Sequence, residues 1–242
     1  MMLAVMLAVS ILTPQHKTSF DVSKFVLPES AKLLVVVEGT GGTECNVYAY
    51  EKTAVTDAAG KTKESWTPAL GVKGYLGRNG MNAYRKEGDK TTPIGIFKMN
   101  TPFGQKPAQE GFPKNYIQVD ESYTWNDVTN RLEKNPDVTG EHVGTSRYEG
   151  YYDYVIDAGY NPNAVPKKGT ALFLHCGVEG DTETSGCVQV DTASMIEIMK
   201  LYGKYGDGAC FIAQCPAGKF DLMYDSYGIF GGLSPNGDFT TK

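Results

Sequence analysis

Short β-rich runs divided by glycine and proline are the feature that most constrains the fold of this 242-residue chain. The sequence holds 28 Gly and 12 Pro, together with 15 Tyr and 10 Phe. Glycine and proline favour turns, and aromatic residues favour strands. We therefore expect a mainly β fold with many short strands rather than long helices. The length allows one generous domain or two small ones.

The β-rich runs give specific expectations. Residues 32–38 and 45–52 predict a hairpin across a glycine-rich turn. Residues 66–76 continue in short pieces, and a loop then leads into a strand that begins at Ile94. Further strands are predicted over residues 154–158, 170–176, 187–190 and 208–214.

One helix is predicted near the end of the chain. Asp191 or Thr192 can cap it, and Gly203 or Gly206 can end it. Its apolar residues recur at helical spacing and are Met195, Ile196, Met199 and Tyr202. Residues 101–150, in contrast, are polar with scattered aromatic anchors and follow neither the helical nor the strand period. A stretch of this length predicts a functional insertion or cap.

The N-terminus has the pattern of an export signal. Residues 1–12 are apolar except for Ser10, and they are shorter than the ~20 residues of a membrane-spanning helix. They predict a signal peptide, either removed or kept as a membrane tether, with a buried terminal helix as the alternative. We assign residues 1–25 to this segment and its linker, and residues 26–242 to a single folded domain. Export would place the protein outside the cytoplasm, in the cell envelope or secreted.

Composition and charge exclude several classes of partner. The net charge of −5 and the pI near 5.3 provide no basic field, so we expect no nucleic-acid partner. Three histidines are too few for a convincing zinc site, and no metal is predicted. Residues 39–42 lack the strand–loop–helix setting of a dinucleotide site, so no cofactor is predicted. The oligomeric state cannot be predicted from these features.

Five cysteines leave one thiol unpaired if the protein is exported. Cys210 and Cys215 could close a small disulfide, bind a metal, or act as two small hydrophobic residues in a strand, and the last is favoured. The more informative cysteine is Cys187, which lies 12 residues after His175. A thiol becomes a useful nucleophile when a base raises its thiolate fraction, and histidine is the natural base.

The strand pattern tells which side chains can meet at this pair. Alternation over residues 170–176 places Phe173 and His175 on one face and Cys176 on the other. The loop after Gly177 can return the chain so that Cys187 lies alongside His175. Gly186 would then let a substrate carbonyl approach the amides of Gly186 and Cys187, which predicts an oxyanion hole there. The alternative from spacing alone is a buried cysteine and a hydrogen-bonded core histidine.

Three motifs show a resemblance to a known family. Residues 175–190, HCGVEGDTETSGCVQV, resemble the L,D-transpeptidase (YkuD-like) signature, in which a strand histidine precedes a Ser/Thr-x-Gly-Cys turn, here Thr184 to Cys187. Residues 77–97, GRNGMNAYRKEGDKTTPIGIF, resemble the upstream Gly-Asp-x-x-Thr-Pro-x-Gly segment of that family, and residues 152–175 are similar to one of its branches. The resemblance extends over residues 77–202.

The resemblance implies both a fold and a chemistry. It implies a β-sandwich or barrel with one or two packed helices and a long polar insertion. It further implies that residues 26–242 act on peptidoglycan stem peptides, with Cys187 as nucleophile and His175 as base. The thiol would form a thioester with a stem tetrapeptide and pass the peptide to an amine acceptor. The residues expected to bind substrate are Thr184, Ser185, Gln189 and Tyr160.

Two departures from the family pattern leave alternatives open. Ser185 stands where many members have a second histidine, and Gln189 where many have an arginine or asparagine. Gln189 carries no charge to pair with a substrate carboxylate. A carboxypeptidase or cysteine peptidase, in which water replaces the amine, is therefore one alternative, and a non-catalytic wall-binding module is another. A lowered pKa of the Cys187 thiol would favour the enzyme, and an inert buried thiol would favour the binding module.

Overall fold

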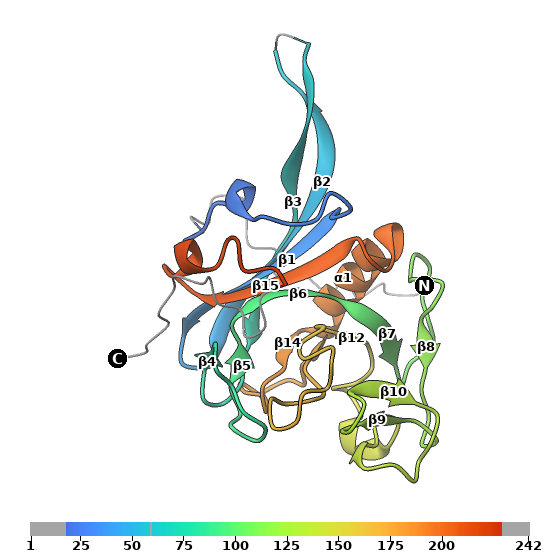
Figure 1. Cartoon of the computed structure of the whole chain (residues 1–242). Coiled ribbons are helices and arrows are strands. Elements are labelled where there is room, and N and C mark those ends of the chain that lie inside the picture. Colours follow the sequence, from blue (N-terminus) through green and yellow to red (C-terminus); the bar gives the residue numbers. More distant parts are fainter. Residues whose placement is uncertain (1–17, 59, 229–242) are drawn as a thin grey trace.

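The computed structural model describes residues 18–58 and 60–228 and confirms the mainly β prediction (Figure 1). Within these residues, ten strands form one mixed sheet in the order β6, β15, β1, β2, β3, β14, β13, β12, β7, β8. In that order the strands are Gly95–Lys98, Cys210–Pro216, Leu33–Gly41, Glu44–Thr56, Thr62–Tyr75, Val188–Val190, Phe173–Cys176, Val155–Asp157, Asn100–Gly104 and Ile117–Gln118. A short parallel pair is formed by β4, Met81–Asn82, and β5, Thr92–Pro93.

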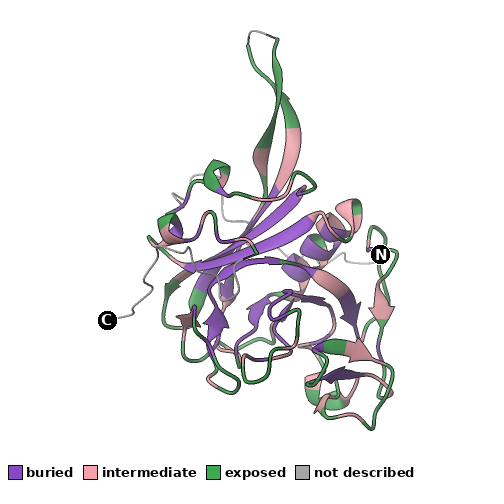
Figure 2. Ribbon diagram, viewed as in Figure 1, coloured by how far each residue is buried: buried purple, intermediate pink, exposed green. Residues whose placement is uncertain are grey.

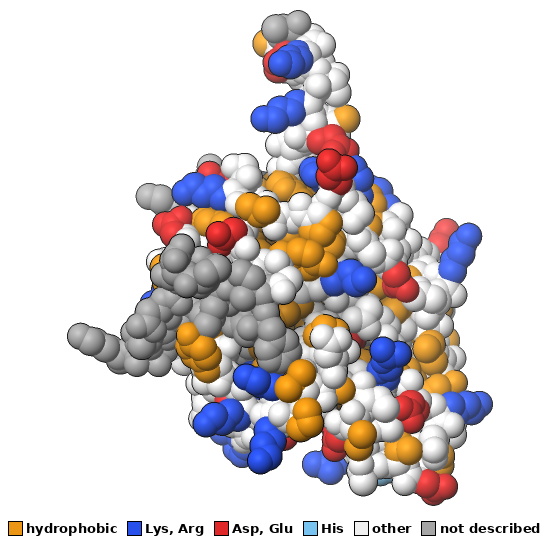
Figure 3. All heavy atoms as spheres, viewed as in Figure 1, with side chains coloured by type: hydrophobic (Ala, Val, Ile, Leu, Met, Phe, Trp, Pro, Cys, Tyr) orange, Lys and Arg blue, Asp and Glu red, His pale blue; other side chains and the backbone are white. Residues whose placement is uncertain are grey.

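The predicted N-terminal hairpin is present as antiparallel β1 and β2, and β1 also pairs in parallel with β15. The prediction of short pieces over residues 66–76 is wrong, because β3 is one long strand that pairs with β2 along its length. The pairing of β2 with β3 shifts its register between Ala49 and Tyr50 of β2. This shift accounts for the irregular pattern of apolar residues in β3. The outer half of this β2–β3 arm projects from the body and is mostly exposed (Figures 1 and 2). It carries both basic and acidic side chains on the face shown in Figure 3.

The main sheet is buried on both faces. Alternate residues of β1 enter different clusters, since Val35 and Val37 belong to the main core and Leu34 and Val36 to a second core. The same alternation separates Cys210 and Cys215 in β15, which lie in the main and second cores. All five cysteines are free thiols, so the prediction of two small hydrophobic residues in a strand is confirmed for this pair.

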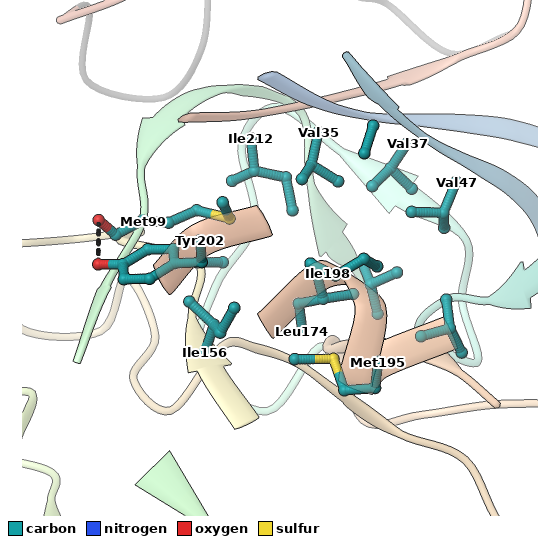
Figure 4. Packing of buried hydrophobic residues seen from close by; sticks show 14 of the residues in the cluster. Val35, Val37, Val47, Met99, Ile156, Leu174, Met195, Ile198, Tyr202 and Ile212 are labelled. Carbon is teal, nitrogen blue, oxygen red and sulfur yellow. Dashed lines mark hydrogen bonds between the residues drawn. The ribbon is translucent and has the colours of Figure 1, made fainter. Parts of the chain in front are cut away.

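The predicted helix is α1, Thr192–Tyr205, which packs against the main core (Figure 4). The Asp191 carboxylate accepts a hydrogen bond from the Ser194 amide and caps the N-terminus, and Gly206 caps the C-terminus at φ 75°. The side chains of Met195, Ile198, Met199 and Tyr202 are buried. Within the described residues there are also three short 3-10 helices, at Val22–Lys24, Ser146–Tyr148 and Phe220–Leu222.

The predicted insertion over residues 101–150 supplies most of β7 and all of β8 to the main sheet, and its remainder forms a cap. It includes a three-stranded sheet of β9, Thr124–Asn126, β10, Arg131–Glu133, and β11, Gly140–Glu141. Trp125 is 1% exposed and packs between Phe103 and Phe173, which joins the cap to the main sheet in a third cluster. The insertion therefore packs beside the strand that carries His175.

The N-terminal assignment is only partly within the described residues, because residues 1–17 lie outside them. The boundary at residue 26 stays a prediction. On its N-terminal side, Phe20 and Phe25 are buried in the second core. Among the described residues, no helix combines the length and the apolar character needed to cross a membrane.

Candidate active site

A cavity of about 390 Å³ lies where β13 and the start of β14 meet the cap. Both His175 and Cys187 line it, as do the predicted substrate-binding residues Thr184, Ser185 and Gln189. Its other walls come from the loop that follows β4, from the cap and from the residues that directly follow the cap. The residues from these parts that matter below are Arg85, Glu141, Tyr148, Tyr151 and Tyr152.

The two strands that carry the pair are parallel, with His175 opposite Gln189 and Leu174 opposite Val188. Cys187 is therefore level with Phe173, so the expectation that it lies directly alongside His175 is wrong. A parallel neighbour needs a connection of about a dozen residues, and the loop after Gly177 has that length. The predicted alternation is confirmed, because Leu174 and Cys176 face the main core while Phe173 faces the cap.

Cys187 is held at the base of the cavity and is 8% exposed. Its Sγ accepts a hydrogen bond from the Phe173 amide (3.3 Å) and donates to the Ala171 carbonyl (3.4 Å). Within the described part of the chain, no hydrogen bond joins this thiol to the His175 ring. Burial raises the pKa of the Cys187 thiol to about 12. The lowered pKa expected of an activated thiol is therefore absent from the resting site.

His175 is 4% exposed and its ring is oriented by the backbone. Nδ1 donates to the Cys176 carbonyl at 2.6 Å, since a carbonyl oxygen can only accept. In the neutral ring, Nε2 then carries the free lone pair that a general base needs. Burial lowers the pKa of His175 to about 4, although the carbonyls of Cys176 and Tyr151 favour the protonated ring. The Cys176 carbonyl thus fixes the orientation of the His175 ring, and as a backbone group it could not be identified from the side chains in the sequence.

The turn before Cys187 is braced by Thr184. Its hydroxyl donates to the Cys187 carbonyl (2.7 Å) and accepts a hydrogen bond from the Gly186 amide (3.0 Å). Gly186 has φ 135°, and a Cβ there would lie 2.9 Å from the Thr91 carbonyl oxygen, so glycine is required. The upstream motif supports the same turn, because the Thr92 hydroxyl donates to the Cys187 carbonyl at 3.3 Å.

These contacts correct the predicted oxyanion hole. The Gly186 amide is already engaged by Thr184, so it is not free to bind an oxyanion in this conformation. The Cys187 amide has no hydrogen-bond acceptor among residues 18–58 and 60–228 and remains available. Of the two predicted donors, the resting structure leaves only this one free.

The other residues that were predicted to bind substrate lie in different positions relative to the cavity. Gln189 is 1% exposed, and its Nε2 donates to the Asp181 carbonyl (2.9 Å). Its buried Oε1 has no hydrogen-bond partner within the described residues. Tyr160, the fourth residue predicted to bind substrate, lies outside the lining of this cavity and lines a second one. Its ring instead packs against Phe97 and lies 5.6 Å from the Arg85 guanidinium carbon.

Sequence reasoning assigned no role to Arg85, which the structure shows to be a buried charge. Arg85 is 2% exposed, and its guanidinium donates to the Thr91 carbonyl (3.1 Å) and the Lys168 carbonyl (3.2 Å). It also lies 3.7 Å from the Asp89 carboxylate. Gly169 packs against this group, and a Cβ there would collide with the guanidinium.

Sequence reasoning also missed Glu141, which projects from β11 into the cavity lining. Its Oε2 accepts a hydrogen bond from the Tyr152 hydroxyl at 2.7 Å. Burial of the carboxyl group raises the pKa of Glu141 to about 7. No local pattern marks this half-buried residue, because its hydrogen-bond partner Tyr152 comes from outside the cap sheet. Within the described residues, no group of three or more His, Cys, Asp or Glu side chains could hold a metal ion.

The fold and the cavity define a mainly β protein in which a buried cysteine and a buried histidine share one cavity beneath a cap. Residues 48–204 match the YkuD model, described as the L,D-transpeptidase catalytic domain. The match spans more than half of the chain, and the chain belongs to this family. Its mainly β architecture agrees with the β-sandwich of that family. No curated protein and no solved structure matches the chain.

Proposed function

We propose that this protein is a peptidoglycan L,D-transpeptidase of the bacterial cell wall. The observation that carries the proposal is the placement of Cys187 and His175 in one cavity, inside the region that matches the L,D-transpeptidase family. The nearby free amide of Cys187 adds a donor for an oxyanion. The reaction class is therefore acyl transfer through a thioester, with no cofactor required.

In the acylation step, Cys187 Sγ attacks the carbonyl carbon between the third residue of a stem tetrapeptide and its terminal D-residue. The new C–S bond forms as the C–N bond breaks. His175 Nε2 takes the thiol proton and passes it to the departing amine. The Cys187 amide stabilises the negative charge on the carbonyl oxygen. The D-amino acid leaves, and the rest of the stem stays attached as a thioester.

In the second step, an acceptor amine attacks the thioester and completes a cross-link. Attack by water instead gives an L,D-carboxypeptidase from the same thioester. Because the resting thiol and imidazole are both neutral, no thiolate–imidazolium pair is formed in advance. Proton transfer therefore accompanies attack, as it does when histidine activates a serine.

A second candidate function is a non-catalytic wall-binding module of the same fold. The raised pKa of the buried Cys187 thiol favours it, since an inert buried thiol is the property expected of such a module. The two candidates differ in whether the thiol ever becomes covalently modified. A binding module would hold stem peptides in the same cavity without a thioester.

The deciding experiment is intact-mass spectrometry of the protein mixed with a tetrapeptide-stem muropeptide. The Cys187→Ala variant is measured in the same way for comparison. We expect an adduct on the wild type alone, together with released D-amino acid. Cys176→Ala is the matched control, because that thiol faces the main core, and it should form the adduct normally. A wild type that binds muropeptide with neither adduct nor D-residue would instead establish the binding module.

We also propose that the protein is exported and acts outside the cytoplasmic membrane, where peptidoglycan stems are found. The apolar pattern of residues 1–12 supports this proposal. A fusion of residues 1–25 to a reporter that is active only after export tests it. An inactive reporter would contradict export through this segment.

A further inference from the structure

We propose that Glu141 forms the acceptor subsite of this cavity: its carboxylate binds the acceptor ammonium group and takes the proton that the amine must lose before it attacks the thioester. The inference rests on the function proposed above and deepens it. It names the class of acceptor, a primary amine that is protonated at neutral pH. It also assigns a role to the cap, which supplies this residue.

The geometry places Glu141 close to the reacting pair. Its Oε2 accepts the Tyr152 hydroxyl hydrogen bond at 2.7 Å. The Tyr152 ring is edge-on to the His175 ring, with centroids 5.4 Å apart at 75°. The same ring stacks on Tyr148 with centroids 4.4 Å apart. One tyrosine side chain thus separates the carboxylate from the imidazole, and all four residues line one cavity.

The wall around Glu141 suits an ammonium group. The Tyr148 and Tyr152 rings stack on each other, and the Arg147 guanidinium carbon lies 5.5 Å from the Tyr148 ring centroid, which shows that this aromatic pair accommodates a cation beside it. The carboxylate supplies the charge-assisted acceptor that an ammonium donor requires. Glu141 forms no ion pair with any Lys, Arg or His side chain among the described residues, so its charge is not already paired.

The electrostatic surroundings suit a base at neutral pH. Burial raises the pKa of Glu141 most, and the charges of Asp127 and Glu87 raise it further. The Tyr152 hydrogen bond and the Arg147 charge lower it, and the result is about 7. Above this pH the group is a carboxylate and can accept a proton. A general base is most effective when its pKa lies near the working pH.

His175 is poorly suited to accept the proton that the acceptor ammonium group loses before attack. Its pKa is held at about 4, and its Nδ1 is committed to the Cys176 carbonyl. The acceptor arrives as R–NH3⁺ and loses two protons as the C–N bond forms and the C–S bond breaks. One proton goes to the Glu141 carboxylate before attack. The other returns through His175 to the Cys187 sulfur, which restores the thiol.

The test measures the two half-reactions separately by intact mass. The thioester is first formed with the tetrapeptide-stem muropeptide, and its loss is then followed after addition of glycine amide as the amine acceptor. In Glu141→Gln we expect acylation to change by less than about threefold and aminolysis to slow on the order of 10²-fold. Wild-type aminolysis should rise with pH through about 7, whereas aminolysis in Glu141→Gln should follow only the deprotonation of glycine amide itself and rise at higher pH.

Two comparisons distinguish a role of Glu141 as a general base from a purely structural role. Hydroxylamine is largely unprotonated at neutral pH, so it should bring Glu141→Gln back to within a few-fold of the wild type. Tyr152→Phe removes a hydrogen bond that lowers the pKa of Glu141, so its aminolysis rise should move to higher pH. Glu149→Gln makes the same substitution on an exposed residue outside the cavity lining and should behave as the wild type.

The proposal is overturned if Glu141→Gln matches the wild type in aminolysis rate and pH profile. It is also overturned if both half-reactions slow equally and hydroxylamine restores nothing, because Glu141 would then only support Tyr152. A wild type that forms no thioester is a different result. It would refute the proposed function, and the acceptor subsite would fall with it.

Discussion

At the residue scale, the site combines a thiol and an imidazole that are both neutral at rest. Burial is the common cause, since it disfavours the charged form of each group. The Cys187 thiol is held by the Phe173 amide and the Ala171 carbonyl instead of by His175. In the proposed mechanism, bound substrate must therefore replace these contacts before the thiol can react.

This state predicts how Cys187 reacts with iodoacetamide in the absence of substrate. A thiol whose pKa is about 12 should be alkylated about tenfold faster for each pH unit between 6 and 9, without a plateau. Peptide mass spectrometry after limited labelling would measure Cys187 alone, with the fully buried Cys176 as the slow internal reference. A rate that is high and constant above pH 6 would show a preformed thiolate–imidazolium pair and contradict the prediction.

The residues that sequence reasoning identified are those with a local pattern. His175 and Cys187 stand in a recognisable strand and turn, and both do line the cavity. Arg85 and Glu141 have no such pattern. Arg85 is buried and donates to the Lys168 carbonyl, 83 residues away, and Glu141 accepts a hydrogen bond from Tyr152, which lies outside the cap sheet. Neither fact can be predicted from the sequence without knowledge of the tertiary contacts.

At the scale of elements, local periodicity in the sequence predicted where most helices and strands lie along the chain. It did not predict which strands pair with one another. The α1 helix was predictable because its cap, apolar stripe and terminal glycine all lie within one segment. The parallel pairing of β13 and β14 was not, since a loop of that length allows either direction. The consequence is chemical, because the parallel register places Cys187 level with Phe173.

The turn that presents Cys187 predicts a specific effect of Thr184→Val. Valine keeps the shape of threonine but removes the hydrogen bonds to the Cys187 carbonyl and from the Gly186 amide. We expect a loss of about 1–3 kcal/mol in the free energy of unfolding and a slower acylation rate. Urea unfolding and intact-mass kinetics measure the two effects. Thr182→Val, on an exposed residue of the same loop, is the control, and an equal effect there would contradict the role of the turn.

At the scale of the whole molecule, a sheet buried on both faces and a packed cap together withdraw several titratable groups from water. Composition and turn content predicted the mainly β class, and the long aperiodic segment predicted the cap. Neither could predict which acids the assembled layers would bury. Asp157 is one of these, and it lies in β12 between β7 and β13.

Asp157 gives the molecule a pH dependence of stability that can be isolated. It is 6% exposed, and burial raises the pKa of its carboxyl group to about 7, above the ~3.9 of an unfolded chain. Between these values the folded state binds more protons than the unfolded state, so this group makes stability fall as pH rises. Asp157→Asn removes the ionisation and keeps an oxygen to accept the Gly159 amide hydrogen bond (2.9 Å).

The advantage of Asp157→Asn over the wild type should therefore be larger at pH 8 than at pH 5, by about 2–3 kcal/mol in the free energy of unfolding. Urea unfolding of both proteins at the two pH values gives this difference directly, and any constant cost of the substitution cancels in it. Asp137→Asn changes an exposed residue of the cap and should show no such difference between the two pH values. An equal effect of Asp157→Asn at pH 5 and pH 8 would mean that the folded sheet accommodates the ionised carboxylate as readily as water does.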